Sequence, residues 1–238
     1  MRVECASRTH VGLKRKINED SILVDSARGL WAVADGMGGH EAGEVASAMV
    51  VDALSSLPAA ADDIDDLAAD AVEALRRVNQ QLIELARTDG GGRTIGTTVV
   101  GLILAGGLFR CFWAGDSRAY RLRDGMLSRI SRDHSLVQQL VDSGMLRAEE
   151  AERHENSNVV TRAVGVAAEV EVDIVAGDAG SGDIFLLASD GLTRVVDDSE
   201  IAAELERSAP ENAADKLLQT VLERGAPDNV SLIIVRLI

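Results

Sequence analysis

Residues 31–40 read Trp31-Ala-Val-Ala-Asp35-Gly-Met-Gly-Gly-His40, an apolar run that ends in an aspartate and a glycine-rich turn. The same order recurs at Ile184-Phe-Leu-Leu-Ala-Ser-Asp190-Gly191, and Asp116 follows a third apolar run. Asp228 stands just before the final apolar run, residues 230–237. An unpaired carboxylate at the end of a buried strand loses roughly several kcal/mol of hydration unless something compensates it. The pattern therefore predicts one shared compensator, and a cluster of hard divalent cations would serve.

Length and composition indicate one large domain. The chain has 238 residues, of which 46% are hydrophobic, so it can bury a full core. Only 3 prolines occur and no Ser/Gly/Pro-rich linker is visible, which favours a single domain over residues 1–238. The net charge of −15 argues against nucleic acid as a partner. Bound divalent cations would offset part of this acidity.

Cysteine usage and hydropathy bear on the location of the protein. Cys5 and Cys111 are far apart and fit neither a zinc motif nor a disulfide framework. The first residues lack the basic-then-apolar order of a signal peptide. The longest apolar stretch, residues 99–109, is too short to span a bilayer and contains Gly-Gly. We expect a monomeric, cytoplasmic protein with no membrane partner.

Hydrophobic periodicity predicts an α+β protein with antiparallel sheets. Helices are expected at residues 44–57, 64–85, 199–207 and 211–224, the last with capping-box spacing at Ser208 and Glu211. Strands are expected at residues 3–9, 21–25, 30–34, 97–104, 108–114, 119–122, 170–175, 184–188 and 230–237. Strands joined by hairpins, with helices in separate pairs, exclude a βαβ order. Residues 133–160 are polar with a small apolar face, which indicates a flap rather than core.

Several familiar phosphate-handling motifs are absent. Glu41 stands where the third glycine of a Gly-x-Gly-x-x-Gly loop would be, and no Walker A lysine pattern occurs. Arg118 follows Cys111 by seven positions, one too many for the Cys-x5-Arg loop of cysteine phosphatases. The carboxylates instead suit a pair of Mg²⁺ or Mn²⁺ ions, which activate a water molecule for in-line attack at phosphorus. An arginine would then bind the phosphate oxygens, because its planar fork matches their geometry.

Short motifs spread over nearly the whole chain resemble those of one family. In order they are Gly12-Leu-Lys-Arg15-Lys-Ile-Asn18-Glu19-Asp20, Asp35-Gly-Met-Gly-Gly-His40, Gly96-Thr-Thr98, Gly115-Asp116-Ser-Arg118, Asp133-His-Ser135, Asn158-Val-Val-Thr-Arg162-Ala-Val-Gly165, Ser189-Asp190-Gly191 and Asp228-Asn229. Together they resemble the metal-dependent protein phosphatases, the PPM or type 2C family, in their compact bacterial form. The resemblance implies a four-layer α-β-β-α sandwich of two antiparallel sheets flanked by helices. It also implies hydrolysis of phosphoserine and phosphothreonine by direct attack of a metal-bridging water.

The resemblance assigns metal ligands by position. Asp35 would bridge two Mn²⁺ or Mg²⁺ ions, and the carbonyl of Gly36 would bind one of them. Asp190 and Asp228 would complete the other ion's protein ligands. Asp116, with Asp190, resembles the pair that holds a third, weaker ion. Asp35 and Asp190 could instead serve turns, because Asp-Gly after a strand is common in turns, and Asp116 could instead cap the turn that follows it.

The remaining family roles concern the substrate. Glu19 and Asp20 would act through metal-bound water molecules. Arg15 would hold the substrate phosphate, although it could be a solvated charge between two lysines. His40 resembles the proposed general acid for the leaving oxygen, but it could merely orient backbone or water. The flap at residues 133–160 would lie beside the cleft and influence substrate choice.

The implied partner is a phosphoprotein, with a cognate Ser/Thr kinase whose action the enzyme would oppose. Two alternatives remain open from the sequence alone. The chain could be a catalytically weak phosphoprotein-binding module on the same fold, but the metal aspartates and Arg15 are all present. It could also be a partner-switching regulator with one dedicated protein substrate.

Overall fold

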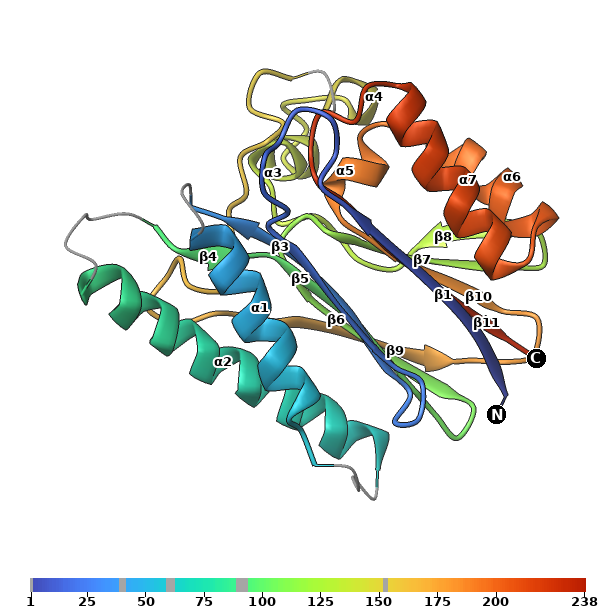
Figure 1. Ribbon diagram of the computed structural model, residues 1–238, viewed down its shortest axis with the longest axis horizontal. Coiled ribbons are helices and arrows are strands. Elements are labelled where there is room, and N and C mark those ends of the chain that lie inside the picture. Colours follow the sequence, from blue (N-terminus) through green and yellow to red (C-terminus); the bar gives the residue numbers. More distant parts are fainter. Residues whose placement is uncertain (1, 39–41, 59–62, 89–93, 152–153) are drawn as a thin grey trace.

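The computed structural model describes residues 2–38, 42–58, 63–88, 94–151 and 154–238, and it has two antiparallel sheets packed face to face (Figure 1). The first sheet has the order β1 (Val3–His10), β11 (Val230–Leu237), β10 (Ile184–Ala188), β7 (Arg118–Arg123) and β8 (Met126–Arg129). The second has the order β2 (Asp20–Asp25), β3 (Leu30–Met37), β5 (Val99–Ala105), β6 (Leu108–Ala114) and β9 (Asp173–Asp178), with β4 (Gly96–Thr97) paired to β3.

Helices cover the outer face of each sheet. α1 (Ala42–Ser55) and α2 (Ile64–Thr88) lie on the second sheet, whereas α6 (Asp198–Arg207) and α7 (Pro210–Glu223) lie on the first (Figure 1). α2 buries Leu67, Ala71 and Leu75 at the four-residue steps of one helical face. The predicted four-layer α-β-β-α sandwich is thereby confirmed.

Side chains along each central strand point alternately to the core between the sheets and to the core under the helices. On β3, Trp31 and Val33 point into the core between the two sheets, while Ala32 and Ala34 face the helices α1 and α2. On β10, Phe185 belongs to the core between the sheets. Both strands are therefore buried on both faces, and Asp35 and Asp190 stand where the apolar run of each strand ends.

Four local features differ from the sequence-based expectation. The strand expected at residues 97–104 is broken at Thr98, whose backbone N–H donates to Asp35 O at 2.8 Å and whose hydroxyl accepts from the Asp35 N–H. The strand expected at residues 170–175 starts later, as β9. The strand β8 and the single-turn helix α5 (Asp190–Thr193) were not predicted.

The expected capping box at Ser208 and Glu211 is wrong. Ala209 is the N-cap of α7 and Pro210 follows it, while the Ser208 hydroxyl donates to Glu204 Oε1 at 2.6 Å. A proline at the first helical position needs no partner for its nitrogen, so this helix starts without a side-chain cap. The capping box is instead at the start of α6, between Asp197 and Glu200.

The segment predicted as a flap carries two short helices, α3 (Leu136–Asp142) and α4 (Ala148–Ala151). Ser135 caps α3 by accepting from the Gln138 N–H at 3.2 Å, and Val137 is its only buried residue. The segment closes on itself through a bridge between Ser135 and Val160. Within the described part of the chain, no helix has the length and apolar character needed to cross a bilayer.

Candidate active site

Four aspartates that are far apart in the sequence meet at one end of the sandwich. They come from the end of β3, the turn between β6 and β7, the start of α5 and the loop before β11: Asp35, Asp116, Asp190 and Asp228. All four line one cavity of about 540 Å³, together with Gly36, Arg15 and Glu19. The structure thus places at one cleft all the described residues to which the sequence assigned metal or phosphate contacts, with Asp20 directly beside it.

Close backbone approaches put Asp35 in position. The Gly36 N–H donates to Glu19 O at 3.1 Å, and Thr97 Oγ1 donates to Asp35 O at 2.9 Å. A side chain on Gly36 would start 2.1 Å from the Gly43 carbonyl oxygen. Only glycine at position 36 therefore lets α1 pack against the end of β3.

Asn229 organises the loop that carries Arg15. Its side-chain amide donates to Val11 O and Ile17 O, each at 2.9 Å, and its Oδ1 accepts from the Glu19 N–H at 2.8 Å. This one buried side chain thus holds both ends of the loop around Arg15 and joins it to Asp228. The sequence motif included Asn229, but nothing local indicated its role as a clamp.

Burial and mutual repulsion perturb the carboxylates. Burial, followed by the charge of Asp20, raises the pKa of Asp35 well above its ordinary value. Burial, with the charge of Asp190, raises the pKa of Asp116 to about 6. The pKa of Asp190 is also raised, chiefly by burial, although Arg194 partly offsets the shift. The cleft therefore lacks enough positive charge for its carboxylates.

Asp20 shows this deficit most directly. It lies opposite Asp35 on the neighbouring strand, a placement that is unfavourable for two like charges. Its Oδ2 accepts from the Ser189 hydroxyl at 2.9 Å, but its buried Oδ1 has no hydrogen-bond partner. Burial raises the pKa of Asp20 to about 7.

The donor set fits hard divalent cations. It consists of carboxylate oxygens and the Gly36 carbonyl, which are the ligands that Mg²⁺ and Mn²⁺ prefer. Among the described residues, no three Asp, Glu, His or Cys side chains form a closed ligand group by themselves. Ions of this class usually keep several water ligands and take few from the protein, so an open arrangement suits them. The orphaned oxygen of Asp20 and the raised carboxylate pKa values support the same assignment.

Two arginines supply positive charge to the cleft. Arg15 Nη2 lies 2.7 Å from Asp228 Oδ2, and the Arg15 side chain is 51% exposed. Arg194 contacts both Asp190, at 2.9 Å, and Asp116, at 3.1 Å. Arg194 was not among the site residues predicted from the sequence, although its four-residue spacing from Asp190 would place both on one helical face.

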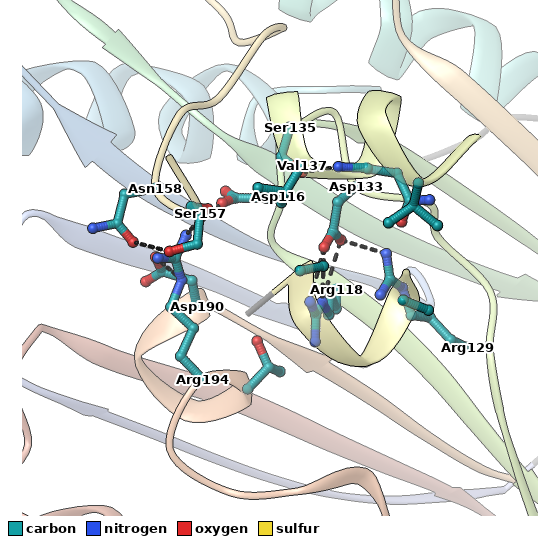
Figure 2. A pocket seen from close by; sticks show the side chains of 15 residues that line it. Asp116, Arg118, Arg129, Asp133, Ser135, Val137, Ser157, Asn158, Asp190 and Arg194 are labelled. Carbon is teal, nitrogen blue, oxygen red and sulfur yellow. Dashed lines mark hydrogen bonds and ion pairs between the residues drawn. The ribbon is translucent and has the colours of Figure 1, made fainter. Parts of the chain in front are cut away.

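A second cavity of about 370 Å³ is also lined by Arg194 (Figure 2). Residues of the flap helices α3 and α4 line this cavity. Arg118 and Arg129, which also line it, both form ion pairs with Asp133. The two cavities share four lining residues: Asp116, Asn158, Asp190 and Arg194.

His40 lies outside the described residues, so its predicted role stays a prediction. Cys111 is fully buried in β6, and burial raises the pKa of its thiol. A protonated thiol inside a strand cannot attack phosphorus, in agreement with the exclusion made from sequence spacing.

Comparisons with known proteins agree with this architecture. The profile of the family described as Protein phosphatase 2C matches residues 9–227. The chain is 38% identical over 232 residues to the serine/threonine protein phosphatase PstP of Mycobacterium tuberculosis. The matched region covers 96% of this chain but only 44% of PstP. The chain therefore spans less than half the length of that relative.

Solved structures match along almost the full chain. One is described as PppA, a key regulatory component of T6SS in Pseudomonas aeruginosa, with a TM-score of 0.91, 43% identity and coverage of 99% of this chain and 98% of that one. Another is the catalytic domain of PstP in complex with 2 manganese ions, with a TM-score of 0.88, 37% identity and coverage of 98% and 97%. With this fold, this cleft and these similarities, the chain belongs to the protein phosphatase 2C family.

Proposed function

We propose that this chain is a metal-dependent protein phosphatase that hydrolyses phosphoserine and phosphothreonine. One observation carries the proposal: carboxylates from four separate elements converge on one cavity without enough cationic partners, and Arg15 stands at its rim. Such a cavity suits a phosphoester, because divalent cations can bind both the carboxylates and the phosphate oxygens. Membership of the family and the manganese-bound relative support the same activity.

We assign the metal ligands as follows. Asp35 would bridge two ions, the Gly36 carbonyl would bind one, and Asp190 and Asp228 would bind the other. Asp116 and Asp190 would hold a third, weaker ion, and Glu19 and Asp20 would act through bound water. Bound there, Mn²⁺ or Mg²⁺ would supply Lewis acidity that neutralises the phosphate and makes a water molecule acidic.

The protein's own side chains bind and orient the substrate. Arg15 is exposed on the loop that Asn229 holds, so its guanidinium can turn from Asp228 to the phosphate oxygens. Water attacks phosphorus directly in this proposal, with no phosphoenzyme, and Cys111 is too deeply buried to act as nucleophile. His40 would give a proton to the leaving serine or threonine oxygen.

The proposed setting is a cytoplasmic, monomeric phosphatase whose phosphoprotein substrates are made by a cognate Ser/Thr kinase. The two unpaired cysteines, Cys5 and Cys111, fit a reducing compartment. We further propose that residues 1–238 form one catalytic domain, because the core between the sheets takes side chains from both β3 and β11. The flap at residues 133–160 would influence substrate choice, since Asn158 lines the cleft.

The test is phosphate release from a phosphothreonine peptide by metal-stripped protein, with Mn²⁺ titrated back. Saturable, Mn²⁺-dependent release is expected, and Asp190→Ala should abolish it. Asp215→Ala is the matched control, because Asp215 is exposed on α7 and pairs with Arg8 away from the cleft. No release by folded, Mn²⁺-binding wild type would refute the activity and favour a phosphoprotein-binding module.

A further inference from the structure

Arg194 lines both cavities. It follows the last residue of α5, and its backbone N–H closes that turn by donating to Asp190 O at 2.9 Å. Its guanidinium makes three contacts: Nε with Asp190 Oδ2 at 2.9 Å, and Nη2 with both Asp116 Oδ2 and the Ser157 carbonyl at 3.1 Å. Figure 2 shows this side chain beside Asp190, close to Ser157 and Asn158.

The first two contacts place a permanent positive charge against two proposed metal ligands. The Asp116 side chain is only 7% exposed, and that of Asp190 is 19% exposed, so water screens neither well. Arg194 supplies a compensating charge to both carboxylates. A divalent cation on this pair would need the same region of space and would meet the charge of Arg194 at short range. The two cations cannot both sit against the same carboxylates without strong repulsion.

The third contact reaches the flap. Ser157 belongs to residues 133–160, and its carbonyl accepts from the same Nη2 that contacts Asp116. If Arg194 leaves Asp116, this nitrogen also leaves Ser157 unless the whole flap follows. The second cavity, which Arg194 already lines, gives the side chain a place to turn.

We propose that Arg194 is a positioning residue that competes with a divalent cation for Asp116 and Asp190, and that the binding of this cation releases Arg194 from Ser157 in the flap. The proposal rests on the proposed assignment of Asp116 and Asp190 as metal ligands. In this scheme Arg194 makes the third ion weak and links its occupancy to the flap.

The first test measures Mn²⁺ binding to metal-stripped protein by titration calorimetry. Arg194→Gln removes the charge, so the weakest class of Mn²⁺ sites should bind about ten-fold tighter or more, given the strength of short-range repulsion near a protein surface. Arg194→Lys keeps the charge and should stay close to wild type. Arg87→Gln, an exposed charge on α2 paired with Glu84, controls for the change in net charge and should have no effect.

The second test follows amide hydrogen exchange at residues 155–159. In metal-free protein, Arg194→Gln should speed exchange there, and saturating Mn²⁺ should bring wild type to the same faster rate. Equal Mn²⁺ affinity in wild type and Arg194→Gln, or equal exchange in the two metal-free proteins, would overturn the proposal. Failure of the proposed function would look different: neither protein would release phosphate from the peptide at saturating Mn²⁺.

Discussion

Asp20→Asn should stabilise the metal-free protein while weakening its use of metal. Asparagine has nearly the same shape as aspartate, and its Oδ1 can still accept from the Ser189 hydroxyl. The change removes one of two carboxylates that face each other across β2 and β3. The substitution therefore removes the charge of Asp20 while leaving its packing nearly unchanged.

The magnitude follows from the pKa of Asp20, which burial raises from 3.8 to about 7. Each pKa unit corresponds to about 1.4 kcal/mol, so keeping this group ionised in the folded protein costs about 4 kcal/mol. For an acid whose pKa is raised on folding, this cost is absent below pH 4, grows as the pH rises, and is complete above pH 7. Wild type without metal should thus lose stability from pH 5 to pH 8.

The assay is urea unfolding of metal-stripped wild type and Asp20→Asn, at pH 5 and pH 8. At pH 8 the variant should be more stable by about 2 to 4 kcal/mol, and at pH 5 the difference should shrink to about 1 or 2 kcal/mol. Saturating Mn²⁺ should stabilise wild type more than the variant. A variant that is less stable than wild type at pH 8 without metal would refute the claim that the ionised Asp20 lacks a compensating charge.

Three further substitutions test the substrate side of the cleft. Arg15→Ala should raise KM for phosphopeptides about ten-fold or more, since a lost charge-assisted contact is worth about 1.5–3 kcal/mol, and unchanged KM in steady-state kinetics would remove its phosphate role. Asn229→Ala should lower the free energy of unfolding by about 2–4 kcal/mol through its lost hydrogen bonds. It should also raise KM for phosphopeptides, as Arg15→Ala does, because the loop that carries Arg15 is no longer held. A destabilised variant with normal KM would contradict this role of Asn229. His40→Ala should slow phosphopeptide hydrolysis more than that of an activated aryl phosphate, and equal losses would exclude it as general acid.

The carboxylates of the cleft could be predicted from the sequence because the burial of the strands determines both the apolar pattern and the positions of the aspartates. A strand buried on both faces leaves no room for a charged side chain except at its end, so Asp35 and Asp190 mark where β3 and β10 leave the core. The sandwich then packs two such ends side by side. This part of the site follows from local sequence and the layered architecture.

The strand predicted at residues 170–175 shows where local pattern fails. Val170 and Val172 do alternate, but they pack against the helix-side core under α2 as part of a loop. The actual strand β9 starts at Asp173 and is mostly exposed, because it pairs only with β6 at the edge of its sheet. Its pairing is set by backbone hydrogen bonds that hydrophobic periodicity does not record.

The residues that connect the site could not be predicted for a different reason. Arg194 reaches Asp116 across 78 positions, and Asn229 reaches the loop of Arg15 across more than 200. The spacing of Arg194 from Asp190 and the Asp228-Asn229 pair indicate that both residues lie near the site. Neither pattern indicates the distant partner of the residue, because that contact forms only in the folded chain. The proposed ligands can therefore be predicted from strand ends, whereas the neighbouring charges and hydrogen bonds that hold them depend on tertiary contacts. For that reason we expect Arg194 to be the residue outside the proposed ligand set at which a single substitution changes the metal affinity most.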